Sequence, residues 1–333
     1  MRAQIMVPVV DALRSRLFGQ DDWTRLEELG DVHVTSPNFT DPDTAARLAQ
    51  ADVIITGWGS GCLDVHAVQH ASNLRAIVHT GGSVRSVATP AVYERGITVS
   101  SQTVANSQPV AEFSLALILL AGKQAFRAQR LYAEKRAFID REEYFPDAGL
   151  YRTRIGLVGL SRISRRLIEL LAPFDVEVVV FSRHLNADAA AALGVVASGL
   201  DDLLSSCDVV SLHSAALPST QHMIGARELG RLRDGATLVN TARGALIDHA
   251  ALERELSTGR IWAIIDTTDP YEPLPPDSPL WDLPNVMLTP HFAGAVGKEL
   301  NRLGRAAVDD VEAILQGRVP AGVVTEAQYE AQA

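Results

Sequence analysis

Short apolar runs alternate with amphipathic stretches along almost the whole chain of 333 residues. A short apolar run followed by a stretch with helical periodicity is typical of a buried strand joined to a helix. Such βα units build parallel sheets, because helices cover both faces of the sheet and leave its strands buried. The alternation therefore predicts an α/β protein.

The predicted strands fall into two series. The first series covers residues 4–10, 32–35, 52–56, 74–79 and 97–100. The second series covers residues 154–159, 176–181, 195–196, 208–213, 237–240, 261–266 and 286–289. Two series predict two doubly wound parallel sheets in separate domains. The chain length and a hydrophobic content of 47% are sufficient for a core in each domain.

The remaining segments are predicted to be helices and connections. Residues 107–122 predict an apolar helix, buried at a domain or subunit interface, whose first turn would hold Pro109 and Glu112. The polar and aromatic residues 135–151 predict a connecting segment. Helical periodicity returns at residues 299–316, and we expect this helix to pack back on the first domain. The polar tail from Thr325 is expected to fray.

The charge and the cysteines limit the class of protein. A formal net charge of −10 disfavours nucleic acid and anionic membranes as partners, so an anionic ligand must meet locally placed arginines. The two cysteines, Cys62 and Cys207, lack disulfide or metal-ligand spacing and predict a reduced protein without a metal site. We find no secretory leader and no apolar stretch of about 20 residues, and we therefore expect a soluble cytoplasmic protein.

The segment from Ile155 to Leu171 contains an apolar strand, a tight turn and an amphipathic helix. This is the context of the dinucleotide-binding fingerprint GxGxxG, whose glycines permit the turn, the approach of pyrophosphate and close helix packing. Only the first glycine, Gly159, is present. Ser161 and Ser164 occupy the other two positions, where a hydroxyl could bond a phosphate oxygen.

The next strand ends in Phe181-Ser182-Arg183-His184. An acidic residue here would accept hydrogen bonds from the ribose hydroxyls of NAD, and none is present. Ser182 leaves room for a 2′-phosphate and Arg183 can pair with it, which favours NADP over NAD. The alternative is that Arg183 is a solvated loop residue.

Three polar residues, Arg243, Glu272 and His291, each follow a predicted strand in the last third of the chain. The carboxyl ends of parallel strands share one edge of a sheet, where ligands bind in open α/β folds. The three side chains are therefore predicted to converge in an active site.

Several separated motifs occur in the order found in one known family. They are Val110–Glu112, Gly156–Gly159, Val209–His213, Asn240–Asp248, Glu272–Pro275 and Leu288–Gly294. On these motifs the chain resembles the D-isomer-specific 2-hydroxyacid dehydrogenase family, most strongly over residues 105–294.

The resemblance implies two domains with an active site in the cleft between them. Residues 1–103 and 296–333 would form a flavodoxin-like substrate-binding domain, and residues 104–295 a Rossmann NAD(P)-binding domain. It also implies a homodimer and the reversible reduction of a small 2-oxo acid to a D-2-hydroxy acid.

The resemblance assigns a role to each member of the trio. Arg243 would bind the substrate carboxylate and polarise the 2-oxo group, while His291 would act as acid and base. Glu272 would hydrogen-bond His291. The chain has one residue more between Asp266 and Glu272 than the family spacing, so Asp269 is an alternative partner. The intact Glu-Pro-Leu-Pro context favours Glu272.

The resemblance also implies the residues that hold the two ligands. Cofactor binding is assigned to Gly159, Ser161, Arg162, Ile163, Ser182, Arg183, His213, Pro218, Thr241, Asp266 and His291, with Asp266 bonding the nicotinamide carboxamide. Substrate binding is assigned to Trp58, Gly82, Ser83, Val84 and Arg243. Trp58 either forms a wall of the pocket or packs between domains, and the neighbouring Arg85 either adds charge or points to solvent.

Three functions are compatible with these features. The first is a dehydrogenase, the second a non-enzymatic dinucleotide sensor similar to the corepressors on this fold, and the third a dimeric scaffold without nucleotide binding. The trio favours the enzyme, because a sensor needs no proton donor. The substrate stays open between glyoxylate, hydroxypyruvate, phenylpyruvate and branched 2-oxo acids, because pocket shape sets that specificity.

Overall fold

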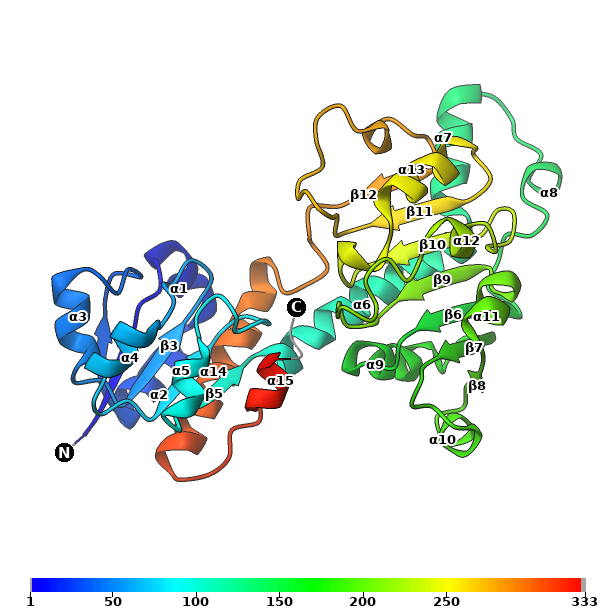
Figure 1. Cartoon of the computed structure of the whole chain (residues 1–333). Coiled ribbons are helices and arrows are strands. Elements are labelled where there is room, and N and C mark those ends of the chain that lie inside the picture. Colours follow the sequence, from blue (N-terminus) through cyan, green and yellow to red (C-terminus); the bar gives the residue numbers. More distant parts are fainter. Residues whose placement is uncertain (1, 331–333) are drawn as a thin grey trace. The chain divides into compact units, whose positions relative to one another are not determined.

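The computed structural model of the chain describes residues 2–330, which divide into two compact units (Figure 1). Unit 1 is formed by Met1–Ser107 and Ala295–Ala333, and unit 2 by Gln108–Gly294. The boundary between the units falls inside the long helix α6 (Thr103–Gly122). Each unit is an α/β body with its own core.

Unit 1 contains a parallel sheet with the strand order β2-β1-β3-β4-β5. Its strands are β1 (Ala3–Val7), β2 (Gly30–Val34), β3 (Val53–Thr56), β4 (Ala76–His79) and β5 (Thr98–Ser101). Its helices are α1 (Asp11–Leu17), α2 (Gln20–Leu29), α3 (Pro42–Leu48), α4 (Val65–His70), α5 (Pro90–Glu94), α14 (Leu300–Leu315) and α15 (Glu326–Glu330), with the short 3-10 turn η3 (Gly297–Glu299) before α14. This strand order is that of flavodoxin-like folds.

Unit 2 contains a parallel sheet with the strand order β12-β11-β10-β9-β6-β7-β8. Its strands are β6 (Thr153–Val158), β7 (Val176–Phe181), β8 (Val196–Ala197), β9 (Val209–Leu212), β10 (Thr237–Asn240), β11 (Trp262–Ile265) and β12 (Val286–Leu288). The order reverses between β6 and β9, which is the switch point of a Rossmann sheet. The predicted class, with two doubly wound parallel sheets, is confirmed.

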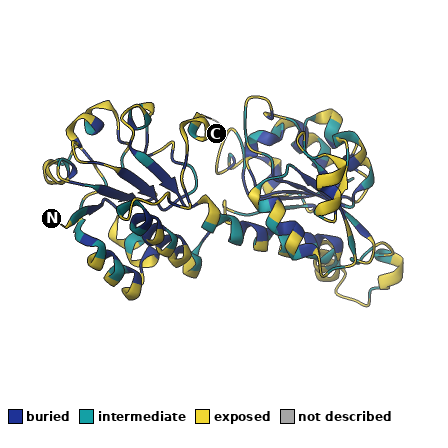
Figure 2. Ribbon diagram, turned by 90° about the horizontal axis from the view of Figure 1, so that it is seen from below, coloured by how far each residue is buried: buried dark blue, intermediate teal, exposed yellow. Residues whose placement is uncertain are grey.

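Helices cover both faces of the sheet in unit 2, so its central strands are buried (Figure 2). These helices are the unit-2 part of α6, α7 (Ala125–Lys135), α8 (Arg141–Tyr144), α9 (Arg162–Leu171), α10 (Ala187–Ala192), α11 (Leu200–Ser206), α12 (Ala226–Leu229) and α13 (His249–Ser257). Neighbouring residues of a strand face opposite cores, as Val209 and Val210 of β9 do.

Helix α6 departs from its predicted form. It begins at Thr103 rather than 107, so Pro109 lies inside the helix and not in its first turn. The earlier start is explained by helical bonding that begins with Asn106 N donating to Gln102 O at 2.8 Å. The helix is also long and apolar enough, by length and composition alone, to cross a membrane. A buried core helix passes the same test, and Ile118 of α6 is buried in the core of unit 2.

The tail is more ordered than predicted. Residues 326–330 form α15, where the Tyr329 ring packs 5.1 Å from the Tyr93 ring and its hydroxyl donates to Ala88 O at 3.2 Å. The expected fraying is therefore wrong as far as Glu330, because one aromatic side chain anchors the segment. Residues 331–333 lie outside the described part of the chain.

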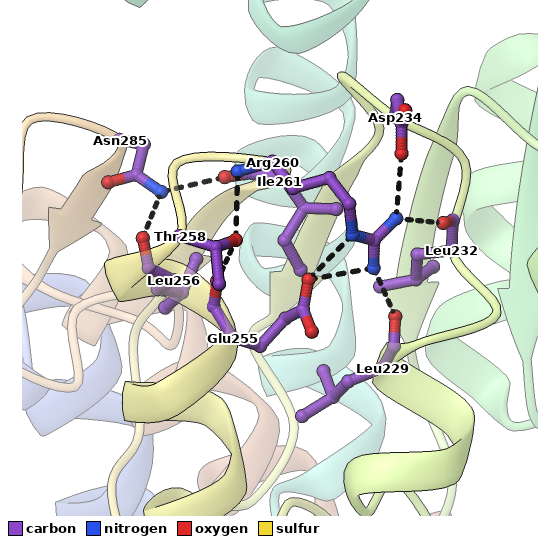
Figure 3. A network of polar contacts seen from close by, with 9 residues as sticks. All are labelled: Leu229, Leu232, Asp234, Glu255, Leu256, Thr258, Arg260, Ile261 and Asn285. Carbon is purple, nitrogen blue, oxygen red and sulfur yellow. Dashed lines mark hydrogen bonds and ion pairs between the residues drawn. The ribbon is translucent and has the colours of Figure 1, made fainter.

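A polar network stabilises the amino end of the sheet in unit 2, opposite the strand ends that carry the predicted site (Figure 3). The Arg260 guanidinium donates to Leu229 O at 2.9 Å and to Leu232 O, at the end of α12 and just beyond it. It also pairs with Glu255 of α13 at 2.7 Å and with Asp234 at 3.1 Å. Arg260 thereby joins α12 and α13 to the start of β11.

Candidate functional site

The predicted trio lies at the carboxyl edge of the sheet in unit 2. Arg243, Glu272 and His291 follow β10, β11 and β12, which are neighbours in the sheet. Because these strands are parallel, the loops after them lie at the same edge.

His291 and Glu272 form a pair. The imidazole Nδ1 lies 3.0 Å from the Glu272 carboxylate Oε1, and the two side chains are 50% and 43% exposed. Within residues 2–330 no other carboxylate lies within ion-pair distance of this imidazole, Asp269 included. The geometry therefore joins His291 to Glu272 and leaves Nε2 for a ligand.

The backbone that carries His291 is fastened to the end of β11. His291 N donates to Asp266 O at 2.9 Å, and its φ of 52° lies in the left-handed region. The Asp266 carboxylate is buried and accepts hydrogen bonds from Thr289 Oγ1, from Phe292 N at 2.6 Å and from Ala293 N at 3.0 Å. Asp266 therefore fixes the loop around His291, and its bond to a carboxamide stays a prediction.

The Arg243 loop packs against the segment that leads to Glu272. An added Cβ on Gly244 would lie 2.2 Å from the carbonyl carbon of Thr268, so only glycine fits at this contact. The loop is closed by Asn240, whose Nδ2 donates to Arg243 O at 2.9 Å and whose Oδ1 accepts from Ala242 N at 3.1 Å. The exposed Arg243 guanidinium donates to Ala242 O at 2.7 Å, which leaves further N–H groups for an anion.

The phosphate loop lies between β6 and α9. Gly159 has a φ of 104°, and an added Cβ would lie 2.7 Å from Ser214 N, so the position requires glycine. Ser161 and Ser164 cap the helix reciprocally. Ser161 N donates to Ser164 Oγ at 2.6 Å, and Ser164 N donates to Ser161 Oγ at 3.3 Å.

A pocket of about 390 Å³ opens beside this loop. Five of the predicted cofactor residues line it, namely Gly159, Ser161, Ser182, Arg183 and His213. Six others are not among its lining residues, namely Arg162, Ile163, Pro218, Thr241, Asp266 and His291. Lining residues that the sequence did not single out include Leu160, Phe181, His184, Ser214, Ser219 and Thr220. The sequence carried a signal for Ser219 and Thr220, because they directly follow Pro218 and a proline with serine or threonine is typical of a turn.

His213 forms part of the pocket wall. Its ring is buried, Nε2 lies 3.0 Å from Ser211 Oγ, and Nδ1 has no hydrogen-bond partner in the part of the chain that the structure describes. Burial lowers the pKa of His213 to about 4, so the ring is neutral at pH 7. A buried polar atom without a partner at a pocket wall fits a site that a polar ligand completes.

Arg183 is held at the same pocket by an unpredicted partner. Its Nη2 donates to Ser219 Oγ at 3.3 Å. Arg183 lies in the loop after β7, whereas Ser219 lies in the loop after β9. Thr241, by contrast, is buried and bonds Ser114 of α6 through its hydroxyl at 2.9 Å, so its polar group is used inside the unit.

Apart from Arg243, the residues assigned to substrate binding lie in unit 1, after β3 and β4. Trp58 is 46% exposed, and an added Cβ on Gly81 would lie 3.3 Å from Trp58 Cε2, so the two loops touch. Gly82 and Ser83 are partly exposed, whereas Val84 is fully buried in the core. Val84 can therefore serve a ligand only through its backbone.

Two residues beside this loop acquire partners that the sequence did not reveal. The Arg85 guanidinium lies 5.1 Å from the Tyr329 ring and donates to Glu330 O at 2.9 Å, so this exposed side chain contacts α15. His79 is buried at the end of β4, with Nδ1 at 3.0 Å from Thr56 Oγ1, and burial lowers its pKa to about 4.

A second cavity of about 380 Å³ lies in unit 2 between α7 and the strands β11 and β12. Its lining includes Phe126, Arg130, Trp262 and Met287 and none of the predicted site residues. It is separate from the strand-end edge where the trio lies.

The fold and the pocket together define a class. Unit 2 is a Rossmann-type domain with a phosphate loop at the switch point of its sheet. Gly159 in that loop and the unpartnered His213 in the wall of the adjoining pocket are features of a dinucleotide site. A sequence model of the D-isomer specific 2-hydroxyacid dehydrogenase NAD binding domain matches residues 115–293. The chain belongs to the D-isomer specific 2-hydroxyacid dehydrogenase family, as the motifs predicted.

Relatives of known name cover most of the chain. The D-3-phosphoglycerate dehydrogenase of Methanocaldococcus jannaschii is 29% identical over 301 residues, which are 90% of this chain and 56% of the relative. The chain thus spans little more than half the length of that relative. The glyoxylate reductase of Aeropyrum pernix is 30% identical over 266 residues, 79% of each chain.

Solved structures share the fold. The TT0316 protein from Thermus thermophilus is 30% identical with a TM-score of 0.76, covering 98% of this chain and all of that one. A D-lactate dehydrogenase with NAD⁺ from Lactobacillus jensenii is 20% identical with a TM-score of 0.81, covering 97% of this chain and 99% of that one. At 20% identity, the likeness to the D-lactate dehydrogenase concerns the fold alone.

Proposed function

We propose that the protein is an NAD(P)-dependent oxidoreductase that interconverts a 2-oxo acid and a D-2-hydroxy acid. The observation that carries the proposal is the 3.0 Å contact between His291 Nδ1 and Glu272 Oε1 in the loops beside Arg243. A histidine oriented by a carboxylate at a ligand-binding edge is suited to proton transfer, and a neighbouring guanidinium is suited to a carboxylate. The names of the relatives, glyoxylate reductase among them, support this class of substrate.

Each member of the trio has one task in this proposal. Glu272 holds Nδ1–H of His291, so Nε2 faces the substrate and donates a proton to the 2-oxo oxygen during reduction. In the reverse direction Nε2 takes the proton from the hydroxyl group. Arg243 binds the substrate carboxylate with its planar fork and polarises the oxo group. The nicotinamide dinucleotide, when bound, supplies or accepts the hydride.

The proposal assigns substrate contacts in unit 1 to Trp58 and to the backbone of Gly82, Ser83 and Val84. The proposal also includes a homodimer in the cytoplasm. It includes no binding to nucleic acid or membranes, and the net charge of −10 supports this last point. Light scattering of the purified protein tests the dimer, for which a monomer mass would be the contrary result.

Oxidation of NADPH and NADH, followed by absorbance, tests the activity against glyoxylate, hydroxypyruvate, phenylpyruvate and branched 2-oxo acids. We expect turnover with at least one acid and a decrease of roughly 10²- to 10⁴-fold in kcat for His291→Asn. The control is His66→Asn, on the exposed surface of α4, which should keep the wild-type rate. A wild-type protein that binds dinucleotide and reduces no acid would instead be the non-enzymatic sensor.

For the cofactor we propose NADP in preference to NAD. Arg183 and Ser182 line the pocket, no acid follows β7, and Ser219 holds the Arg183 guanidinium there. A charged hydrogen bond contributes about 1.5–3 kcal/mol, so Arg183→Ala should weaken NADPH binding roughly 10- to 100-fold. The Kd for NADH should change less than about threefold. Equal losses for both cofactors would contradict the role of Arg183 in binding a 2′-phosphate.

A further inference from the structure

The phosphate loop carries two serines, Ser161 and Ser164, at positions where the family fingerprint has glycines. Four backbone N–H groups at the start of a helix lack partners within that helix, and here they belong to Ser161, Arg162, Ile163 and Ser164. The serine pair satisfies the first and the last of these. Among the described residues, the N–H groups of Arg162 and Ile163 have no acceptor.

The serine hydroxyls are occupied by each other and by the backbone. Ser164 Oγ accepts from Ser161 N at 2.6 Å and donates to Ser161 O at 3.1 Å, and the Ser164 side chain is fully buried. Ser161 Oγ accepts from Ser164 N and lies 3.3 Å from Ser164 Oγ. In this arrangement Ser164 cannot reach a ligand, and Ser161 is already engaged by its partner.

The site around the pair is built for an anion. The loop borders the pocket of about 390 Å³, whose wall also holds the unpartnered Nδ1 of His213. Gly159 allows no side chain between the loop and Ser214, so the backbone itself faces the pocket. A helix start with free N–H groups and its positive dipole end favours phosphate.

We propose that Ser161 and Ser164 form a self-contained cap that replaces the two missing glycines. The cap fixes the first turn of α9 and leaves the N–H groups of Arg162 and Ile163 as the donors to the pyrophosphate of the dinucleotide. The serines are then positioning residues and not ligands. This inference depends on the proposed dinucleotide binding and explains how the altered loop retains it.

The decisive variant is the double substitution Ser161→Gly with Ser164→Gly, which restores the fingerprint and removes both hydroxyls. If the hydroxyls only cap the helix, the Kd for NADPH, measured by fluorescence titration, should stay within about threefold of the wild type, because glycine is a fair N-cap. The Tm of the ligand-free protein should fall by a few degrees. A loss of roughly 10-fold or more in affinity would show that the hydroxyls bind phosphate and would overturn the inference.

A second variant tests where the phosphate lies. Ser161→Asp keeps a strong N-cap, so the Tm of the ligand-free protein should be unchanged or higher, while a carboxylate beside the pyrophosphate should raise the Kd more than about tenfold. An unchanged Kd would overturn the inference. The control Ser205→Ala, on the exposed face of α11, should alter neither quantity.

These titrations separate the inference from the proposed function. Wild-type protein that binds neither NADPH nor NADH would overturn both. Wild-type protein that binds, combined with loss of binding in the double-glycine variant, would overturn the inference alone. Neither result depends on finding a substrate that is turned over.

Discussion

His291 is oriented by two carboxylates with different tasks. Glu272 contacts its ring at 3.0 Å, whereas the buried Asp266 holds the backbone on both sides of it through Thr289, Phe292 and Ala293. A left-handed backbone in a residue other than glycine costs on the order of 1 kcal/mol and persists where the surroundings fix it. The bonds to Asp266 supply that constraint.

The first prediction at the residue scale concerns Glu272. In Glu272→Gln the amide can no longer stabilise a protonated imidazole, and we expect kcat/KM to fall about 100-fold with little change in the Kd for the dinucleotide. Steady-state kinetics and fluorescence titration measure the two quantities. Asp269→Asn is the matched control and should change kcat/KM less than about threefold. If the two variants lose activity equally, Glu272 is not the partner of His291.

The sequence favoured Glu272 over Asp269 only through its Glu-Pro-Leu-Pro context, because the contact with His291 depends on the path of one loop. Residues 267–272 form a turn in which Thr268 Oγ1 donates to Tyr271 O at 2.6 Å, and this turn presents Glu272 to the imidazole. The contact between Arg183 and Ser219 could not be predicted from the sequence either, because the two residues belong to different strand-end loops. Strand-end positions were predictable, but contacts between loops were not.

At the scale of elements, the sequence predicted all twelve strands of the two sheets. Strands that are buried on both faces appear as nearly continuous apolar runs, and that signal is strong in a single sequence. Helix ends were predicted less well. The start of α6 at Thr103 depends on the Gln102 carbonyl, and α15 depends on packing of Tyr329 against Tyr93. Neither contact leaves a local pattern in the chain.

The prediction that belongs to this scale concerns Arg260. Its side chain is 27% exposed and joins two helices to β11 through the Leu229 and Leu232 carbonyls and Glu255 (Figure 3). Arg260→Met keeps the aliphatic stem but removes the donor to the Leu232 carbonyl and the partner of Glu255, while Leu229 O keeps only Leu232 N as a donor. The free energy of unfolding should therefore fall by about 2–3 kcal/mol.

Urea unfolding followed by circular dichroism measures this loss. Arg254→Met on the exposed face of α13 is the control and should change the unfolding free energy by less than about 0.5 kcal/mol. Similar values for the two variants would mean that Arg260 does not stabilise the amino end of the sheet.

At the scale of the whole molecule, each unit buries one neutral histidine. His79 lies in unit 1 and His213 in unit 2, and the pKa of each is lowered to about 4 by burial. In the unfolded chain each ring has a pKa of about 6.5, so between these values the unfolded state binds a proton that the folded state excludes. Both units should therefore be most stable above pH 6.5 and lose stability as the pH falls towards 4.

Each histidine should reduce the unfolding free energy by about 1.4 kcal/mol per pH unit, or on the order of 3 kcal/mol over the whole interval. The four tryptophans allow the units to be followed separately, because Trp23 and Trp58 lie in unit 1 and Trp262 and Trp281 in unit 2. Replacing one pair by phenylalanine leaves fluorescence from the other unit.

Urea unfolding between pH 7.5 and 4.5 should show the decrease in unfolding free energy in both units. His79→Asn should flatten the decrease in unit 1 alone. His213→Asn should reduce the decrease in unit 2 alone, where His249, whose pKa is also lowered by burial, contributes the remainder. The exposed His66→Asn should leave both slopes unchanged, and a variant of His79 or His213 that kept the wild-type slope would contradict burial of a neutral ring at that position.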